Sequence, residues 1–138
     1  MLSSTSNAKV KFVRSLQARS RNRRAAQAFV VEGVRLIEDV VASKWEMKQV
    51  FFSNELSERG MLIVKRCKEF GVETDKVDAR VMQEISDTMH PQGIVAVVAK
   101  KTLSIPDQLD FVLILDQLRD PGNLGTILRT SAAANIQA

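Results

Sequence analysis

The sequence of 138 residues has few of the residue types that build disulfide or metal scaffolds. It contains one cysteine, one histidine, one tryptophan, three prolines and no tyrosine. A single cysteine, Cys67, excludes an intramolecular disulfide framework, and with one histidine it offers no metal-ligand cluster. Because Cys67 lies in an amphipathic stretch, we expect a buried structural thiol.

Long apolar runs are also missing. No run approaches the roughly 20 residues needed to cross a bilayer, and the amino terminus lacks the apolar core of a signal peptide. With 45% hydrophobic and 26% charged residues, the composition is ordinary for a globular protein. We therefore expect no membrane partner, and a location in the cytoplasm or, in a eukaryote, in an organelle.

Acidic residues are absent from the first 31 positions. This segment carries seven basic residues, whereas residues 32–138 carry 13 basic and 16 acidic residues, a net charge of −3. Such an arm suits a polyanion, because each phosphate contact releases counterions. A basic transit peptide and a solvated helix face are the alternatives. The candidate phosphate contacts are Lys9, Lys11, Arg14, Arg19, Arg21, Arg23, Arg24 and Arg35.

Helical and strand patterns alternate over residues 7–100. Apolar spacing predicts helices over 7–19, 34–43, 57–71 and 78–86, with Ser57 and Asp78 as N-caps. Compact apolar runs predict strands over 28–33, 48–53, 72–77 and 93–100, the third at an edge and the last buried on both faces. The arginine-rich segment 19–24 is interpreted as a loop or helix end. This order predicts an α/β fold, a small α/β/α sandwich built from crossover units.

The pattern changes after residue 100. Residues 101–110 are polar, contain Pro106 and are predicted to be an interdomain linker. Residues 111–116, FVLILD, are predicted to be the most hydrophobic strand, and residues 123–138 a helix with Asn123 as its N-cap. The sequence thus predicts one domain over 1–100 and the start of a second over 111–138.

The turn before that helix reads RDPGNLGTILR, residues 119–129. A strand, a glycine-rich turn and a helix start bring backbone N–H groups and the positive end of the helix dipole to one point, which suits an anion or nucleotide. Side chains in a helix lean toward its N-terminus, so Arg129 can lie back over Gly125. A common tight turn followed by a solvated arginine is the alternative. The opposite, core-facing stripe consists of Leu124, Ile127, Leu128 and Ala132.

Residues 119–138 resemble the first motif of the SpoU/TrmH branch of the SPOUT-class RNA methyltransferases. The positions in register are Asp120, Pro121, Asn123, Gly125, Ile127, Arg129 and Ala133. Asn135 stands where the family often has glycine, and asparagine tolerates the same left-handed helix end. Upstream, FVVEGVR and HPQGIVAV are similar to the substrate-binding domain that precedes the knotted domain in this family. The similarity starts near Asn7, which argues against a transit peptide over 7–31.

The resemblance implies methyl transfer from S-adenosylmethionine to a ribose 2′-hydroxyl of rRNA or tRNA, by a homodimer with a parallel α/β knot. It implies that the amino-terminal domain, similar to small RNA-binding ribosomal proteins, holds the RNA. Arg129 would be catalytic, and Asn123 would fix it or a neighbouring phosphate. The structural motif positions would be Pro121, Gly125, Glu32 and Gly33, with a helix-start role for Glu32 as an alternative.

The chemical role of Arg129 has two possible forms. A guanidinium stays protonated in proteins, which favours positioning and charge stabilisation. Deprotonation by unusual local electrostatics is the alternative.

The family's later cofactor-binding motifs are not in these 138 residues. We therefore expect a substrate-binding domain plus the opening unit of a catalytic domain, inactive alone. A non-catalytic RNA-binding module is the alternative, and a nucleotide-binding α/β regulator is disfavoured because no phosphate-loop spacing is present. Gln92 and His90 are interpreted as turn residues and Trp45 as a core or helix-end anchor, and Phe12 alone is too little for a stacking platform.

Overall fold

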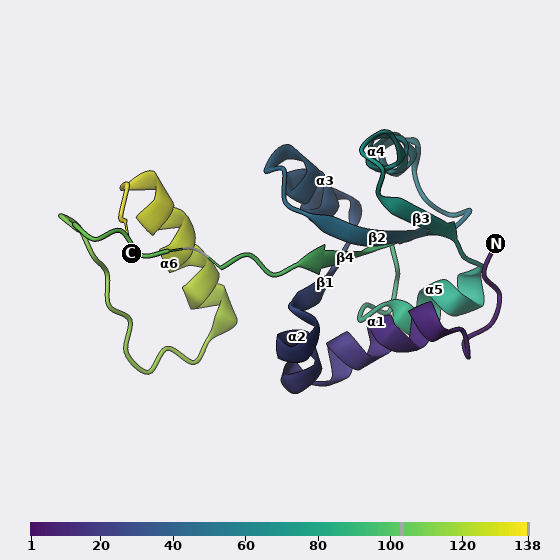
Figure 1. The fold of residues 1–138 in the computed structure, drawn as a ribbon, viewed down its shortest axis with the longest axis horizontal. Helices are drawn as coiled ribbons and strands as arrows, with labels where there is room; N and C mark the ends of the chain where they lie inside the picture. Colours follow the sequence, from purple (N-terminus) through teal and green to yellow (C-terminus); the bar gives the residue numbers. More distant parts are fainter. Residues whose placement is uncertain (103, 138) are drawn as a thin grey trace. The chain divides into compact units, whose positions relative to one another are not determined.

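The computed structural model describes residues 1–102 and 104–137, and the chain divides into two compact units, Met1–Lys101 and Thr102–Ala138. The first unit contains a four-stranded sheet with helices on both faces (Figure 1). Its strands are β1 (Ala28–Glu32), β2 (Met47–Phe52), β3 (Glu73–Lys76) and β4 (Ile94–Ala99), in the order β1-β4-β2-β3. β2 and β3 are parallel, whereas β4 is antiparallel to both β1 and β2. The sheet is therefore mixed, with β1 and β3 at its edges.

Helices cover the two faces of this sheet. α1 (Ala8–Ala18) and α5 (Ala79–Ile85) lie on one face, and α3 (Val34–Ala42) and α4 (Glu58–Glu69) lie on the other (Figure 1). The predicted α/β/α layers are confirmed. Both predicted N-caps are also confirmed: Ser57 Oγ accepts from Gly60 N at 3.3 Å, and Asp78 Oδ1 accepts from Val81 N at 2.8 Å. Short polar side chains satisfy the free amides at a helix start.

The prediction of a loop over the arginine-rich segment was wrong in part, because residues Ser20–Ala26 form helix α2. Arginine has good helix propensity, and a solvated helix keeps its like charges in water. None of the residues of α2 is buried, and the helix ends at Gln27, whose φ of 46° and ψ of 46° are left-handed. This turn redirects the chain into β1.

Two hydrophobic clusters lie on opposite faces of the sheet. Val10 and Val13 of α1 pack with Phe51 on one face, and Ile37 of α3 packs with Cys67 of α4 on the other. All of β4 is buried, because alternate side chains of this central strand enter the two clusters. The predictions of a doubly buried strand and of a buried thiol are confirmed.

The second unit contains helix α6 (Pro121–Ala133). The predicted strand over 111–116 was wrong, because no β-pairing is present there in the described part of the chain. A strand needs a neighbour for its N–H and C=O groups. Instead, Phe111 O accepts from Gln137 N at 3.0 Å, and Gln137 Oε1 accepts from Asp110 N at 2.8 Å. No helix among the described residues is long and apolar enough to span a membrane.

Candidate functional site

The start of α6 is organised by Asp120. Its carboxylate oxygen accepts from the backbone N–H of Asn123 at 2.6 Å, and Pro121 is the first residue of the helix. The prediction that Asn123 is the N-cap was therefore wrong: Asn123 lies in the first turn, and its own amide is capped. Proline suits the first helical position because that amide would have no intrahelical acceptor. The Asn123 side chain is consequently not used for capping.

Arg129 folds back along α6 toward this first turn. A Cβ built on Gly125 would lie 3.4 Å from Arg129 Nη1 and 4.0 Å from Nη2, so the guanidinium covers the bare glycine. Arg129 Nη2 also lies 3.4 Å from Thr126 Oγ1, a long hydrogen bond. The prediction that Arg129 lies over Gly125 is confirmed. An exposed, orientable cation is thereby held beside the turn that contains Asn123.

The other face of α6 is apolar and uncovered in the described residues. Leu124 is 40% exposed and Leu128 is 57% exposed. The stripe predicted to face a core is thus present without a core against it. At the far end, Asn135 has a φ of 55°, so asparagine does adopt the left-handed helix terminus where the family often has glycine.

The described residues of the second unit do not enclose a pocket for S-adenosylmethionine. None of the described residues among 104–137 is buried, and Phe111 and Ile114 are 53% and 87% exposed. A pocket for a cofactor of this size needs walls that bury most of its surface. In its described residues the second unit therefore contains the arginine motif without buried walls for a cofactor site.

Two of the candidate phosphate contacts on α1 are engaged in ion pairs. Lys9 Nζ lies 2.6 Å from Glu73 Oε1 and 2.7 Å from Asp75 Oδ2. The hydrogen bond to Asp75, and to a smaller extent the one to Glu73, raises the pKa of Lys9. Arg14 Nη1 lies 2.7 Å from Glu84 Oε1. Phosphate binding at these positions would compete with carboxylates already in place.

Arg23 is engaged differently. Its Nη1 donates to Leu16 O at 2.7 Å and to Gln17 O at 3.1 Å, so it caps the carboxyl end of α1 while keeping its charge. The other candidates have no ion pair among the described residues; they are Lys11, Arg19, Arg21, Arg24 and Arg35. All eight stay predictions, and this second group has the charge most available to a phosphate.

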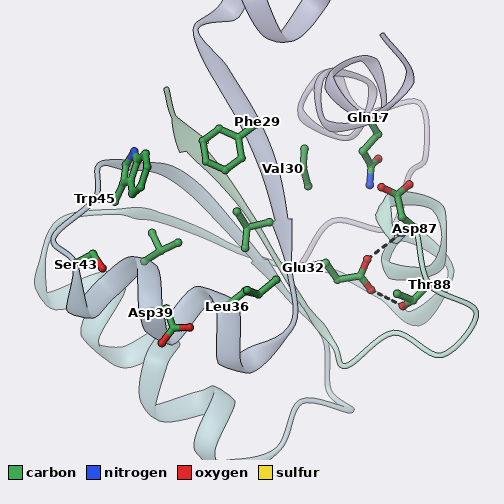
Figure 2. Close-up of a pocket in the computed structure, with 12 residues that line it drawn as sticks. Gln17, Phe29, Val30, Glu32, Leu36, Asp39, Ser43, Trp45, Asp87 and Thr88 are labelled. Atoms are coloured by element: carbon green, nitrogen blue, oxygen red, sulfur yellow. Dashed lines mark hydrogen bonds between the residues drawn. The ribbon is translucent and has the colours of Figure 1, made fainter. Parts of the chain in front are cut away.

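Glu32 ties the end of β1 to the loop after α5. Its carboxylate accepts from Ser86 Oγ at 2.8 Å, Asp87 N at 2.9 Å and Thr88 Oγ1 at 2.6 Å. Figure 2 shows the carboxylate directed at Asp87 and Thr88. Its alternative role at the helix start was wrong: Gln92 Oε1 accepts from Val34 N at 3.0 Å and caps α3 instead.

Gly33 lies in the chain between Glu32, which binds the Ser86–Thr88 segment, and Val34, whose N–H donates to Gln92. The φ of Gly33 is +97°, a conformation that side chains rarely adopt, and a Cβ there would lie 3.2 Å from Gln92 Oε1. The structural roles predicted for Glu32 and Gly33 thus have a physical basis in the first unit. Gln92, interpreted as a turn residue, has the additional task of capping a helix.

Two neighbouring cavities on the first unit were not predicted. An apolar cavity of about 630 Å³ lies along β1 and is lined by Phe29, Leu36 and Trp45, with Glu32 at one end (Figure 2). A basic cavity of about 580 Å³ shares Phe29 and Trp45 and adds Lys100 and Lys101. Lys100 was predicted to end a buried strand, Lys101 to begin the linker, and Trp45 to be an anchor. The available signal was a lysine pair directly after a buried strand.

Comparison with known proteins identifies the first unit. The family described as the MRM3-like substrate binding domain matches residues 7–96. The chain belongs to this family. The match runs from α1 into the first half of β4, so it includes the basic helices, the Glu32 contacts and the other three strands of the sheet.

Named relatives extend the similarity into the second unit. An uncharacterised tRNA/rRNA methyltransferase of Synechocystis is 30% identical over 138 residues, which cover 99% of this chain and 50% of that protein. Human mitochondrial rRNA methyltransferase 3 is 40% identical over 114 residues, covering 76% of this chain and 26% of that protein. The chain thus spans half or less of the length of these relatives.

Solved structures agree with this placement. An S-adenosylmethionine-bound rRNA methyltransferase from Sinorhizobium meliloti has a TM-score of 0.78 and 27% identity, over 98% of this chain and 51% of that one. The SpoU methyltransferase AviRb from Streptomyces viridochromogenes, also in complex with the cofactor, has a TM-score of 0.74 and 26% identity, over 95% of this chain and 49% of that one. The resemblance to the SpoU/TrmH-type methyltransferases is confirmed.

Proposed function

We propose that the full-length protein carrying this sequence is an S-adenosylmethionine-dependent ribose 2′-O-methyltransferase that acts on rRNA. The observation that carries the proposal is the Arg129 guanidinium lying over Gly125 beside the Asn123 turn. A purely structural helix needs no glycine under an exposed arginine, and glycine in a helix interior is unfavourable by about 1 kcal/mol relative to alanine. The matched relatives named as rRNA methyltransferases support the same substrate class.

Each part of the chain has a task in this proposal. Residues 1–100 hold the RNA, residues 101–110 connect, and residues 111–138 open the catalytic domain. The exposed apolar side chains of 111–115 and of α6 suit burial by further elements of a knotted domain. In the proposal that domain also supplies the cofactor pocket and the contact between two copies of the protein. The proposed location is the cytoplasm or, in a eukaryote, an organelle.

Arg129 acts in the proposal as a fixed positive charge. Methyl transfer forms the bond from the ribose oxygen to the methyl carbon, breaks the carbon–sulfur bond so that S-adenosylhomocysteine leaves, and releases the hydroxyl proton to water. Negative charge develops on the oxygen as that proton departs. A guanidinium placed beside the oxygen stabilises that charge, and its several N–H groups can hold an adjacent phosphate at the same time. Asn123 offers an amide from the first turn of the same helix for that positioning.

The test is Arg129→Ala in the full-length protein, assayed for methyl transfer to its rRNA and for cofactor binding. Removing a charge-stabilising donor costs roughly 10²–10³ in turnover, and we expect at least this loss with cofactor affinity near that of the unmodified protein. Arg119→Ala, in the same unit, is the matched control and should retain activity. Loss of cofactor binding in Arg129→Ala would contradict the role proposed here.

A second candidate function is RNA binding without catalysis by the 138-residue chain itself. It is favoured by the absence of any buried residue among the described residues of 104–137. We expect this chain to bind RNA, to bind no S-adenosylmethionine and to transfer no methyl group. Methyl transfer by the purified chain would contradict this expectation.

A further inference from the structure

The basic cavity lies where the consecutive elements α2 and β1 meet a distant segment, the residues that follow β4. Arg23 and Arg24 come from the end of α2, Phe29 from β1, and Lys100 and Lys101 follow β4. Lys100 N donates to Gln27 O at 2.8 Å, which fixes the end of β4 beside the turn that ends α2. The antiparallel pairing of β1 with β4 therefore brings two pairs of cations together across about 75 residues of sequence.

The charge of this cavity is uncompensated. Its lining contains four cationic side chains and no carboxylate. Lys9 and Arg14, by contrast, face acids on β3 and α5. Within the described residues Arg24, Lys100 and Lys101 have no ion-pair partner. Such a concentration of positive charge attracts phosphates and releases counterions when they bind.

The cavity also has an aromatic wall. Trp45 and Phe29 contact each other edge to face, with ring centroids 6.2 Å apart and planes at 82° (Figure 2). Trp45 Nε1 donates to Ala99 O at 2.7 Å, so the indole is held in place and its polar atom is satisfied. The side chain is nevertheless 37% exposed. A fixed, partly exposed indole beside cations is the arrangement on which proteins stack unpaired bases.

We propose that this cavity is a subsite for one unpaired nucleotide of the RNA substrate. The base stacks against Trp45, with Phe29 behind it, and the flanking phosphates contact Arg24, Lys100 and Lys101. The cavity volume of about 580 Å³ lies within the range of small-ligand sites. The subsite rests on the proposed function, since it assigns part of the RNA to named residues of the first unit.

The neighbouring apolar cavity sets the direction of the strand. It shares Phe29 and Trp45 but contains Glu32, Asp39 and Asp87. These carboxylates repel phosphates, so the sugar–phosphate backbone leaves the aromatic pair on the lysine side. The same asymmetry disfavours an acidic peptide, which would match the cations but leave the aromatic wall unused.

The experiment uses the 138-residue chain and a labelled single-stranded RNA of about eight nucleotides, within the usual site size of such surfaces. Trp45 is the only tryptophan and the chain has no tyrosine, so intrinsic fluorescence reports the surroundings of this one side chain, which lines both the basic and the apolar cavity. Fluorescence anisotropy of the RNA reports total binding independently. We expect saturable quenching of Trp45 with the same midpoint as the anisotropy change.

Two charge variants make the test specific. The double variant Lys100→Ala and Lys101→Ala should lower the slope of log affinity against log salt by about 1.4, since each phosphate contact on a single strand contributes about 0.7. Lys65→Ala with Lys76→Ala removes the same charge from α4 and from β3 at the opposite edge of the sheet, and should leave the slope near its original value. Trp45→Phe should weaken binding several-fold and keep the circular dichroism spectrum, because phenylalanine still stacks but covers less of the base.

The failures are distinguishable. RNA binding by anisotropy without Trp45 quenching, and with equal salt slopes in the two double variants, would overturn the subsite and leave the proposed function standing. No RNA binding at all would overturn both the subsite and the RNA-holding role of the first unit. Equal quenching by polyglutamate would overturn the assignment to RNA.

Discussion

The two units of this chain differ in how their apolar side chains are covered. In Met1–Lys101, a central strand buried along its length separates two hydrophobic clusters. In the second unit, residues 111–115 (FVLIL) are all apolar, like the residues of β4. None of the described residues of 104–137 is buried, however. The first unit therefore has helix layers on both faces of its sheet, whereas the described part of the second has one helix and a segment without regular secondary structure, whose apolar side chains are not covered.

The difference shows that composition alone does not decide order. Residues 111–115 are as hydrophobic as β4, yet β4 is a strand with neighbours on both sides and 111–115 is not. Burial of an apolar run requires other surfaces to cover it, and the free energy comes from the covering rather than from the run. The same difference applies to cavities: the first unit lines several with partly buried side chains, whereas no described residue of 104–137 is buried.

Thiol reactivity gives the largest expected contrast between the units. Cys67 is fully buried, and burial raises the pKa of its thiol. A cysteine introduced at the exposed position Thr130 should react with a thiol reagent at once, because only the thiolate reacts and solvent reaches it. We expect Cys67 to react at a rate at least roughly a thousandfold lower, since its cluster must unfold before the reagent can reach the thiol.

The measurement is the labelling rate of the unmodified chain and of Thr130→Cys at the same pH, with urea-unfolded protein as the reference for both. In urea the two thiols should react alike. Equal rates in the folded protein would show that the α3–α4 face opens as readily as the second unit, and the contrast between the units would fail.

Side-chain truncation gives the next largest contrast. Phe51 has no exposed surface and packs in the α1-side cluster, so Phe51→Ala should lower the free energy of unfolding by about 3–5 kcal/mol. Leu113 in the second unit is 39% exposed, so Leu113→Ala should leave the unfolding of the first unit unchanged. Urea unfolding followed by circular dichroism measures both. A comparable loss in Leu113→Ala would mean that 111–115 is covered in solution.

Local patterns were sufficient to predict much of the fold. Ser57 and Asp78 were identified as N-caps from residue type and position, and apolar spacing located the four helices other than α2 and α6 to within a few residues. The sheet order could not be predicted in this way, because placing β4 between β1 and β2 depends on pairings between distant residues. The mixed character of the sheet follows from that order.

The candidate sites also differ in whether they depend on local geometry or on contacts between distant residues. The position of Arg129 over Gly125 was predictable, since it depends only on the geometry of one helical turn. The cap of α6 was misassigned because Asp120 and Asn123 are equally good N-cap residues, and Pro121 at the first position was the signal that distinguishes them. The meeting of Trp45 with Lys100 required the sheet order and was missed.

The polar contact of Glu32 gives the smallest expected effect. It tests whether the structure of the first unit depends on more than its two hydrophobic clusters. Glu32→Gln keeps the shape of the side chain but removes its charge and one of the oxygens that accept from the Ser86–Thr88 segment. Hydrogen bonds to a charged acceptor are worth more than neutral ones, so we expect a loss of about 1–2 kcal/mol. The backbone amide of Asp87 donates to the Glu32 carboxylate at 2.9 Å, and its hydrogen exchange should become faster. The exchange rates of the β4 amides should change only as much as the global free energy of unfolding does.

Glu38→Gln is the matched control, since Glu38 of α3 pairs with Arg59 of α4 at the surface and the substitution removes the same charge. Surface ion pairs contribute little because water already solvates both partners, so this variant should change exchange at Asp87 not at all. If Glu32→Gln leaves Asp87 as protected as before, the loop after α5 is held by the packing of α5 itself, through Met82 and Ile85, rather than by the carboxylate. The order of the first unit would then come from its two clusters alone, which would make its contrast with the second unit one of burial and nothing else.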